Sequence, residues 1–119
     1  MRNKGSLFLC VAALTFLVLG CACSDEVSSE VISPDEKRIA RVFVRNCGAT
    51  TDYVTHVAIS WRSSKRTNDD IVFTLVGDNE VAVEWSDNRT LRISCKDCED
   101  TNIIRRVTKF GDTTVKFNE

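Results

Sequence analysis

Two cysteines separated by two residues form the most reactive pattern in this sequence. Cys95 and Cys98, in "CKDC", have the spacing of redox dithiols and of one half of a zinc site. In α/β redox proteins this spacing opens a helix, whereas here it closes an apparent strand and continues into Glu99 and Asp100. Thiol–disulfide exchange is therefore the weaker interpretation, and it stays open as an alternative.

A third cysteine, Cys47, lies nine residues before the single histidine, His56. A nucleophilic thiol needs a neighbouring base, and His56 is the only imidazole in the chain. Together with Cys95 and Cys98 these two residues also make a formally complete set of four zinc ligands. No second Cys pair or paired histidines support that set, so a metal-stabilised domain is only an alternative. We predict no catalytic residue, no metal and no cofactor.

The N-terminal segment has the composition of a secretory signal peptide. Arg2 and Lys4 precede a largely apolar run over residues 7–19, and a glycine follows it. The run is shorter than the about 20 apolar residues that a membrane-spanning helix needs. We therefore expect the segment to be removed after export.

"VLGC", residues 18–21, resembles the lipobox of bacterial lipoproteins. The resemblance implies that residues 1–20 are the signal peptide, that cleavage occurs before Cys21, and that Cys21 carries the lipid. Several acyl chains on one residue anchor a protein permanently. Ala22, in the place where aspartate would signal inner-membrane retention, resembles the outer-membrane class, so the predicted location is the bacterial envelope, on the outer membrane facing the periplasm.

Net charge excludes one class of partner. Signal-peptide removal takes Arg2 and Lys4 from the 16 basic residues, which leaves 14 against 17 acidic ones and a net charge of −3. An acidic domain is unsuited to binding nucleic acid through its overall charge. The predicted partners are the membrane, through the lipid anchor, and an envelope protein or glycan.

Beyond the lipobox the chain divides into two parts. Residues 21–33 are rich in serine and acidic residues, and we expect them to be the lipidated cysteine and a flexible tether. The only proline, Pro34, suits the start of a turn, and residues 34–119 are predicted to form one β domain.

Alternating apolar residues set the fold class of that domain. In "VAVEW", residues 81–85, and "TLRISC", residues 90–95, every second residue is apolar, and the intervening "SDNR" has turn chemistry. This is the clearest hairpin signal. "RIARVFVRN", residues 38–46, is apolar on both faces and predicts a strand that is partly covered on both sides. We predict an all-β fold, a small antiparallel sandwich or strongly bent sheet of six to seven strands.

A distinctive loop follows the first of these strands. "RNCGATTDY", residues 45–53, resembles a family of small bacterial lipoproteins marked by a Cys-Gly-Ala-Thr-Thr motif. That family has no assigned activity, so the resemblance implies fold and location only. The residues of the candidate binding loop are Thr50, Thr51, Asp52 and Tyr53.

A second candidate surface is "WRSSKR", residues 61–66, where Trp61 and Arg62 combine an aromatic ring with positive charge. Asp69 and Asp70 follow and neutralise much of that charge, so an ordinary solvated loop is the competing interpretation. We hypothesise that both loops contribute to one interaction surface.

The exported location also bears on the cysteines, because thiols oxidise outside the cytoplasm. We predict a disulfide between Cys47 and either Cys95 or Cys98, which would join the first core strand to the fifth. The cysteine left over could pair with Cys23 if the tether reaches it. The sequence thus predicts a lipid-anchored binding or structural module that is not an enzyme.

Overall fold

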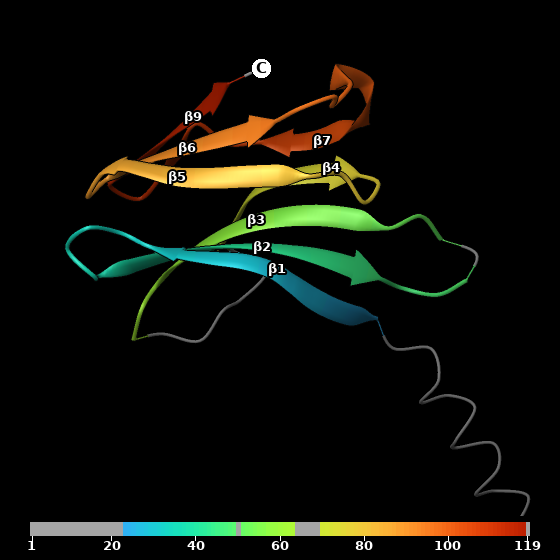
Figure 1. Cartoon of the computed structure of the whole chain (residues 1–119), viewed down its shortest axis with the longest axis horizontal. Helices are drawn as coiled ribbons and strands as arrows, with labels where there is room; N and C mark the ends of the chain where they lie inside the picture. Colours follow the sequence, from blue (N-terminus) through green and yellow to red (C-terminus); the bar gives the residue numbers. More distant parts are fainter. Residues whose placement is uncertain (1–22, 50, 64–69, 119) are drawn as a thin grey trace, which may run out of the picture.

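The computed structural model describes residues 23–49, 51–63 and 70–118, and it places them in two β-sheets packed face to face (Figure 1). One sheet has five strands in the order β1-β2-β3-β4-β7, and the other has four in the order β5-β6-β9-β8. The predicted all-β sandwich is therefore confirmed. The strands are β1 (Ser24–Ile32), β2 (Arg38–Asn46), β3 (Val54–Trp61), β4 (Ile71–Val76), β5 (Val81–Asp87), β6 (Thr90–Cys95), β7 (Ile103–Arg106), β8 (Lys109–Phe110) and β9 (Thr113–Asn118).

The core lies between the sheets and is built from alternate residues of each strand. Ala40 and Val42 of β2 and Val57 and Ile59 of β3 are almost completely buried there. The side chains that point the other way on β2 are also covered, since Phe43 is 1% exposed and packs with Ala58 and Ile71. The prediction of a strand covered on both faces is confirmed.

The predicted hairpin is present as β5 and β6. Val81 lies opposite Cys95 and Trp85 opposite Leu91, and both Trp85 and Leu91 are buried in the core. The carboxylate of Asp87 fixes the turn by accepting hydrogen bonds from the Arg89 backbone N–H and the Thr90 hydroxyl, at 2.8 and 3.1 Å. Turn chemistry and alternation together specified this unit.

The C-terminal part departs from a purely antiparallel sheet. After β6 the chain adds β7 to the far edge of the other sheet, returns through β8, and then pairs β9 with β6 in parallel. Strands β7 and β8 carry the chain back to the end of the sandwich at which β6 begins. Strand β9 therefore starts at that end and runs parallel to β6. The described residues form nine strands rather than six to seven.

The prediction of a flexible tether is wrong for residues 24–32, which form β1 and pair with β2. Charge complementarity explains the pairing, because Asp25 lies opposite Arg45 and Glu30 opposite Arg41, with closest N–O distances of 2.8 and 3.0 Å. Val31 packs against the core, and its carbonyl accepts a hydrogen bond from the Trp85 indole at 2.9 Å. The described fold therefore begins ahead of Pro34.

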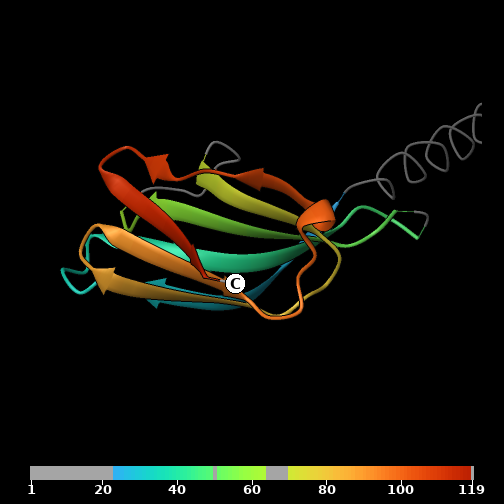
Figure 2. The same ribbon diagram turned by 90° about the horizontal axis from the view of Figure 1, so that it is seen from above.

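The connections gather at the two ends of the sandwich (Figure 2). One end, which we call the disulfide end, carries Cys23 and the loops 47–53, 77–80 and 96–102. The opposite end, which we call the arginine end, carries the turns 33–37, 87–89 and 111–112 and residues 62–63.

Candidate functional site

The two loops predicted to share one interaction surface lie at opposite ends of the sandwich. Strand β3 connects them, because Tyr53 directly precedes it and Trp61 is its last residue. Its eight residues separate the loops by about 25 Å, at about 3.3 Å per residue. The two loops therefore do not form one contiguous patch, and each belongs to a different end.

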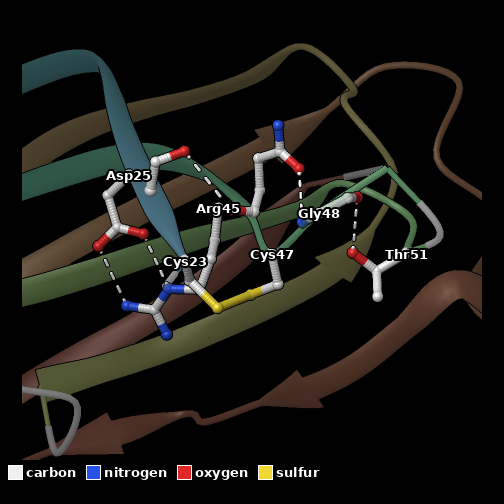
Figure 3. The surroundings of a disulfide bond; sticks show 8 residues. Cys23, Asp25, Arg45, Cys47, Gly48 and Thr51 are labelled. Atoms are coloured by element: carbon white, nitrogen blue, oxygen red, sulfur yellow. Dashed lines mark hydrogen bonds and ion pairs between the residues drawn. A yellow bond between two sulfur atoms is a disulfide. The ribbon is translucent and has the colours of Figure 1, made fainter. Parts of the chain in front are cut away.

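At the disulfide end, local hydrogen bonds shape the loop after β2 (Figure 3). The Asn46 side chain accepts from the Gly48 backbone N–H at 3.1 Å, and the Thr51 hydroxyl donates to the Gly48 carbonyl at 3.1 Å. Gly48 has a φ of 133°, which L side chains rarely adopt. Asp52 and Tyr53 are exposed beyond it, and Thr50 lies outside the described residues.

The predicted disulfide between Cys47 and Cys95 or Cys98 is wrong. Cys47 bonds to Cys23, and Cys95 bonds to Cys98. The reason is register: Ser24 pairs with Asn46, so Cys23 comes directly opposite Cys47 at the end of β1 and β2 (Figure 3). Cys95 belongs to the other sheet.

The Cys95–Cys98 disulfide borders a cavity of about 300 Å³ at the same end of the sandwich. Phe73, Ile93 and Phe117 provide apolar walls, and the Arg106 guanidinium lies 5.1 Å from the Phe117 ring. The segment after Cys98 forms a single 3₁₀ turn at residues 100–102, not an α-helix. The dithiol spacing therefore lacks the helix N-terminus that lowers the pKa of redox thiols.

The four candidate zinc ligands do not converge. Three of them are cysteines in disulfides, and Nδ1 of His56 lies 2.9 Å from the hydroxyl of Thr74. Burial, and secondarily the positive charge of Arg45, lowers the pKa of His56 below its ordinary value of 6.5. Within ranges 23–49, 51–63 and 70–118, no three His, Cys, Asp or Glu side chains cluster as a metal site.

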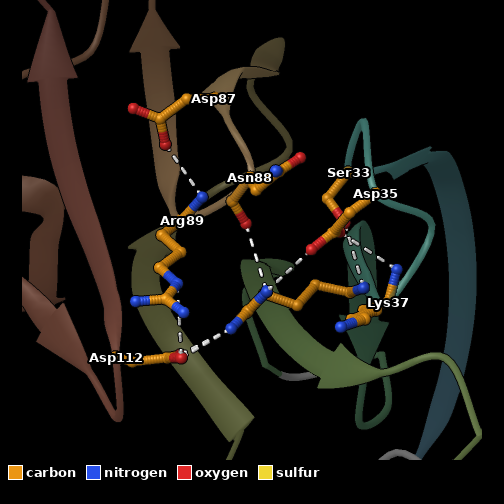
Figure 4. Close-up of polar contacts among 8 residues, drawn as sticks. Ser33, Asp35, Lys37, Asp87, Asn88, Arg89 and Asp112 are labelled. Carbon is orange, nitrogen blue, oxygen red and sulfur yellow. Dashed lines mark hydrogen bonds and ion pairs between the residues drawn. The ribbon is translucent and has the colours of Figure 1, made fainter.

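The arginine end holds a polar cluster that the sequence analysis missed (Figure 4). Arg38, although charged, is only 4% exposed. One nitrogen of its guanidinium lies 2.7 Å from both carboxylate oxygens of Asp112, and the other donates to the Asn88 carbonyl at 3.2 Å. Arg38 thereby links β2 of one sheet to two turns of the other.

The turn before β2 completes this cluster. Asp35 lies 3.6 Å from the Arg38 guanidinium, and the Ser33 hydroxyl donates to Asp35 at 2.7 Å while accepting from the Arg38 backbone N–H at 3.0 Å. The hydrogen bond from Ser33 is the main cause that lowers the pKa of Asp35, and the bond from Arg38 does the same for the pKa of Asp112. Both carboxylates therefore stay ionised around Arg38.

Trp61 lies beside this cluster, in register with Arg38 on the neighbouring strand. The Arg38 guanidinium is 4.6 Å from the Trp61 ring, which is 52% exposed. Arg62 forms an exposed ion pair with Glu36 at 3.3 Å. A cavity of about 320 Å³ opens between Arg38, Trp61 and Asp112. The predicted pair Trp61 and Arg62 therefore lies at the surface, with Trp61 in contact with the Arg38 cluster and Arg62 paired with Glu36.

Only part of the Arg38 cluster can be predicted from the sequence. The turn residues around Pro34, Asn88 and Gly111 are recognisable, but Arg38 and Asp112 are 74 positions apart and nothing local connects them. Tertiary pairing alone brings them together.

Comparison of the chain with protein-family models, with curated proteins and with solved structures found no match. Within the described part of the chain, no helix is long and apolar enough to span a membrane. The resemblance to lipoproteins and the lipidation of Cys21 remain predictions, and Cys21 lies outside the described residues.

Proposed function

We propose that the protein is a lipoprotein of the bacterial envelope that acts as a binding or structural module and not as an enzyme. The observation that carries the proposal is the pairing of all four cysteines after Cys21 into two disulfides. Disulfides persist mainly in oxidising compartments, so their presence supports export. Because these four cysteines are paired with one another, none of them competes with Cys21 for the lipid.

The proposed binding surface is the arginine end, around Trp61 and Arg62. Half-exposed tryptophan and arginine are the residue types that contribute most to interface energies. The buried Arg38 guanidinium contacts the Trp61 ring, and a side chain that is already held in place costs less entropy to immobilise on binding. An envelope protein or a glycan is the proposed partner, with attachment to the outer membrane through Cys21.

The first experiment is the intact mass of the protein extracted from its host membrane, before and after reduction and alkylation. We expect a chain that begins at an acylated Cys21, takes up no alkyl group before reduction, and takes up four afterwards. The matched control is Cys21→Ser, which should keep both disulfides and lose the lipid. A wild-type chain without acyl groups would contradict the proposal.

The same measurement addresses the alternative function. If Cys95 and Cys98 are alkylated before reduction, then the disulfide is absent in the native protein, and a thiol redox role or a metal-stabilised domain gains support. The cavity beside these cysteines, which both apolar and charged side chains line, is the observation that keeps the alternative open.

The binding surface is tested by pull-down from solubilised envelopes with two matched sets of alanine variants. Trp61→Ala with Arg62→Ala changes the arginine end, and Thr51→Ala, Asp52→Ala and Tyr53→Ala change the exposed loop at the disulfide end. We expect the first set to lose the partner and the second to retain it. The reverse pattern would place the binding surface at the disulfide end.

A further inference from the structure

We propose that the disulfide end of the sandwich faces the lipid bilayer at close range and in a fixed orientation, with the arginine end pointing away from the membrane. The inference rests on the proposed lipidation of Cys21 and adds to it the surface that meets the membrane. The partner of that surface is the headgroup layer of the bilayer.

The short chain between Cys21 and the first strand limits the distance between the membrane and the domain. Cys23 follows Cys21 by two residues, and two residues span at most about 7 Å. Cys23 is itself fixed, because it is bonded to Cys47 and because β1 pairs with β2 from Ser24 onward. A flexible tether up to residue 33 would have let the domain reach tens of ångströms from the membrane, and β1 removes that freedom.

The elements around Cys23 define which residues approach the headgroups. The loop that ends at Tyr53 and the loop that begins at Gly77 are joined by a hydrogen bond from the Gly77 N–H to the Tyr53 carbonyl, at 2.7 Å. Tyr53 is 50% exposed at this end, whereas Trp61 lies the full length of β3 away. The two exposed aromatic side chains therefore lie at different heights above the bilayer.

The charge of the disulfide end determines how far this surface enters the bilayer. Its three loops carry six carboxylates and one lysine: Asp52, Asp78, Glu80, Asp97, Glu99 and Asp100 against Lys96. Carboxylates are repelled by anionic headgroups and costly to bury in hydrocarbon. The surface therefore rests at the headgroup level and does not insert.

The experiment measures tryptophan quenching by a nitroxide on the lipid headgroup. The acylated full-length mature protein is reconstituted in phosphatidylcholine vesicles with and without TEMPO-phosphatidylcholine. The wild-type chain has Trp61 and Trp85, and Tyr53→Trp combined with Trp61→Phe moves the exposed indole to the disulfide end. Trp85 is buried and present in both proteins, so it supplies a common background.

We expect the fraction of emission quenched to be at least twofold larger for Tyr53→Trp/Trp61→Phe than for the wild-type chain. Equal quenching, or stronger quenching of the wild-type chain, would overturn the orientation. Failure of lipidation is recognised separately, because the mass of the same sample then lacks acyl groups and the protein does not float with the vesicles.

A third variant tests the role of the disulfide. Cys23→Ser with Cys47→Ser, in the Tyr53→Trp/Trp61→Phe chain, should retain the fold by circular dichroism and lose most of the difference in quenching, because β1 can then fray. An unchanged difference would show that strand pairing alone sets the orientation and would overturn the role assigned to the disulfide.

Discussion

Arg38 is the residue on which the arginine end depends. Its side chain is buried, yet both terminal nitrogens of its guanidinium have partners, which are Asp112, Asp35 and the Asn88 carbonyl. Buried charges are tolerated only with such partners, because desolvation is otherwise costly. The carbon stem of Arg38 packs like an apolar residue while its guanidinium joins the two sheets.

We expect Arg38→Met to lower the free energy of unfolding by about 2 kcal/mol, since it removes the charge-assisted hydrogen bonds to Asp112 and leaves the stem volume filled. Arg62→Met is the matched control, because the Arg62–Glu36 pair is exposed and such pairs contribute less than about 1 kcal/mol. Urea denaturation of both variants measures the difference. Equal losses would mean that the Arg38 cluster does not stabilise the fold.

His56 provides a second prediction at this scale. Its ring packs 5.2 Å from Phe43, bonds to Thr74 and faces Arg45 and Asp25, and its folded-state pKa is lowered mainly by burial. The unfolded chain therefore binds a proton more readily, so the stability contributed by neutral His56 is present above about pH 6.5 and is lost as the pH falls through the folded pKa.

Consequently, the free energy of unfolding of the wild-type protein should fall between pH 7 and pH 5, and His56→Gln should show a shallower fall. Chemical denaturation at several pH values checks this. Parallel curves for the two proteins would show that His56 does not titrate differently in the folded and unfolded states.

At the scale of elements, the two disulfides differ in what they constrain. Cys23 and Cys47 are 24 positions apart and join an edge strand to its neighbour, whereas Cys95 and Cys98 are 3 apart within one turn. Closing a longer loop removes more entropy from the unfolded chain. Loop length predicts about 3.5 kcal/mol for the first disulfide and about 2 kcal/mol for the second.

We therefore expect Cys23→Ser/Cys47→Ser to lose more stability than Cys95→Ser/Cys98→Ser. Urea denaturation without reductant, monitored by circular dichroism, compares the two double variants with the wild-type protein. If the second pair proved the more costly, strain or packing at the 95–98 turn would outweigh loop entropy.

The elements also show where sequence reasoning succeeded. The β5–β6 hairpin was predictable because apolar alternation and the Asp87 turn agree with each other. Strand β1 was not, since its sequence is polar and the contacts that hold it, which are ion pairs with Arg41 and Arg45 of β2 and the Cys23–Cys47 disulfide, are distant in the sequence. Its acidic residues match those arginines only after the two segments are aligned antiparallel with a bulge.

For the whole molecule, the sandwich class followed from composition and period, whereas the pairing of β9 with β6 and the cysteine connectivity required the three-dimensional path. No local signal shows that the chain adds β7 to one sheet before returning to the other. For the same reason, no local signal in the sequence predicts the pairing of Arg38 with Asp112. Contacts distant in sequence are thus the part that the sequence did not reveal.

The domain boundary gives a prediction at this scale. A chain that begins at Pro34, the domain boundary that the sequence predicted, lacks β1, the disulfide partner of Cys47 and the Val31 carbonyl that accepts a hydrogen bond from the Trp85 indole. We expect it to be strongly destabilised relative to a chain that begins at Cys23, with increased Trp85 exposure to acrylamide. Equal stability of the two chains would contradict the assignment of β1 to the fold.

The Cys23–Cys47 bond also determines how the domain responds to a mechanical pull. A force applied ahead of Cys23 would normally peel β1, an edge strand, from β2 one hydrogen bond at a time. The disulfide transfers that force directly to β2, which is hydrogen-bonded on both sides. Unfolding from this point then requires the closed β1–β2 hairpin to separate from β3 as one unit, so the hydrogen bonds between β2 and β3 resist traction on the N-terminus.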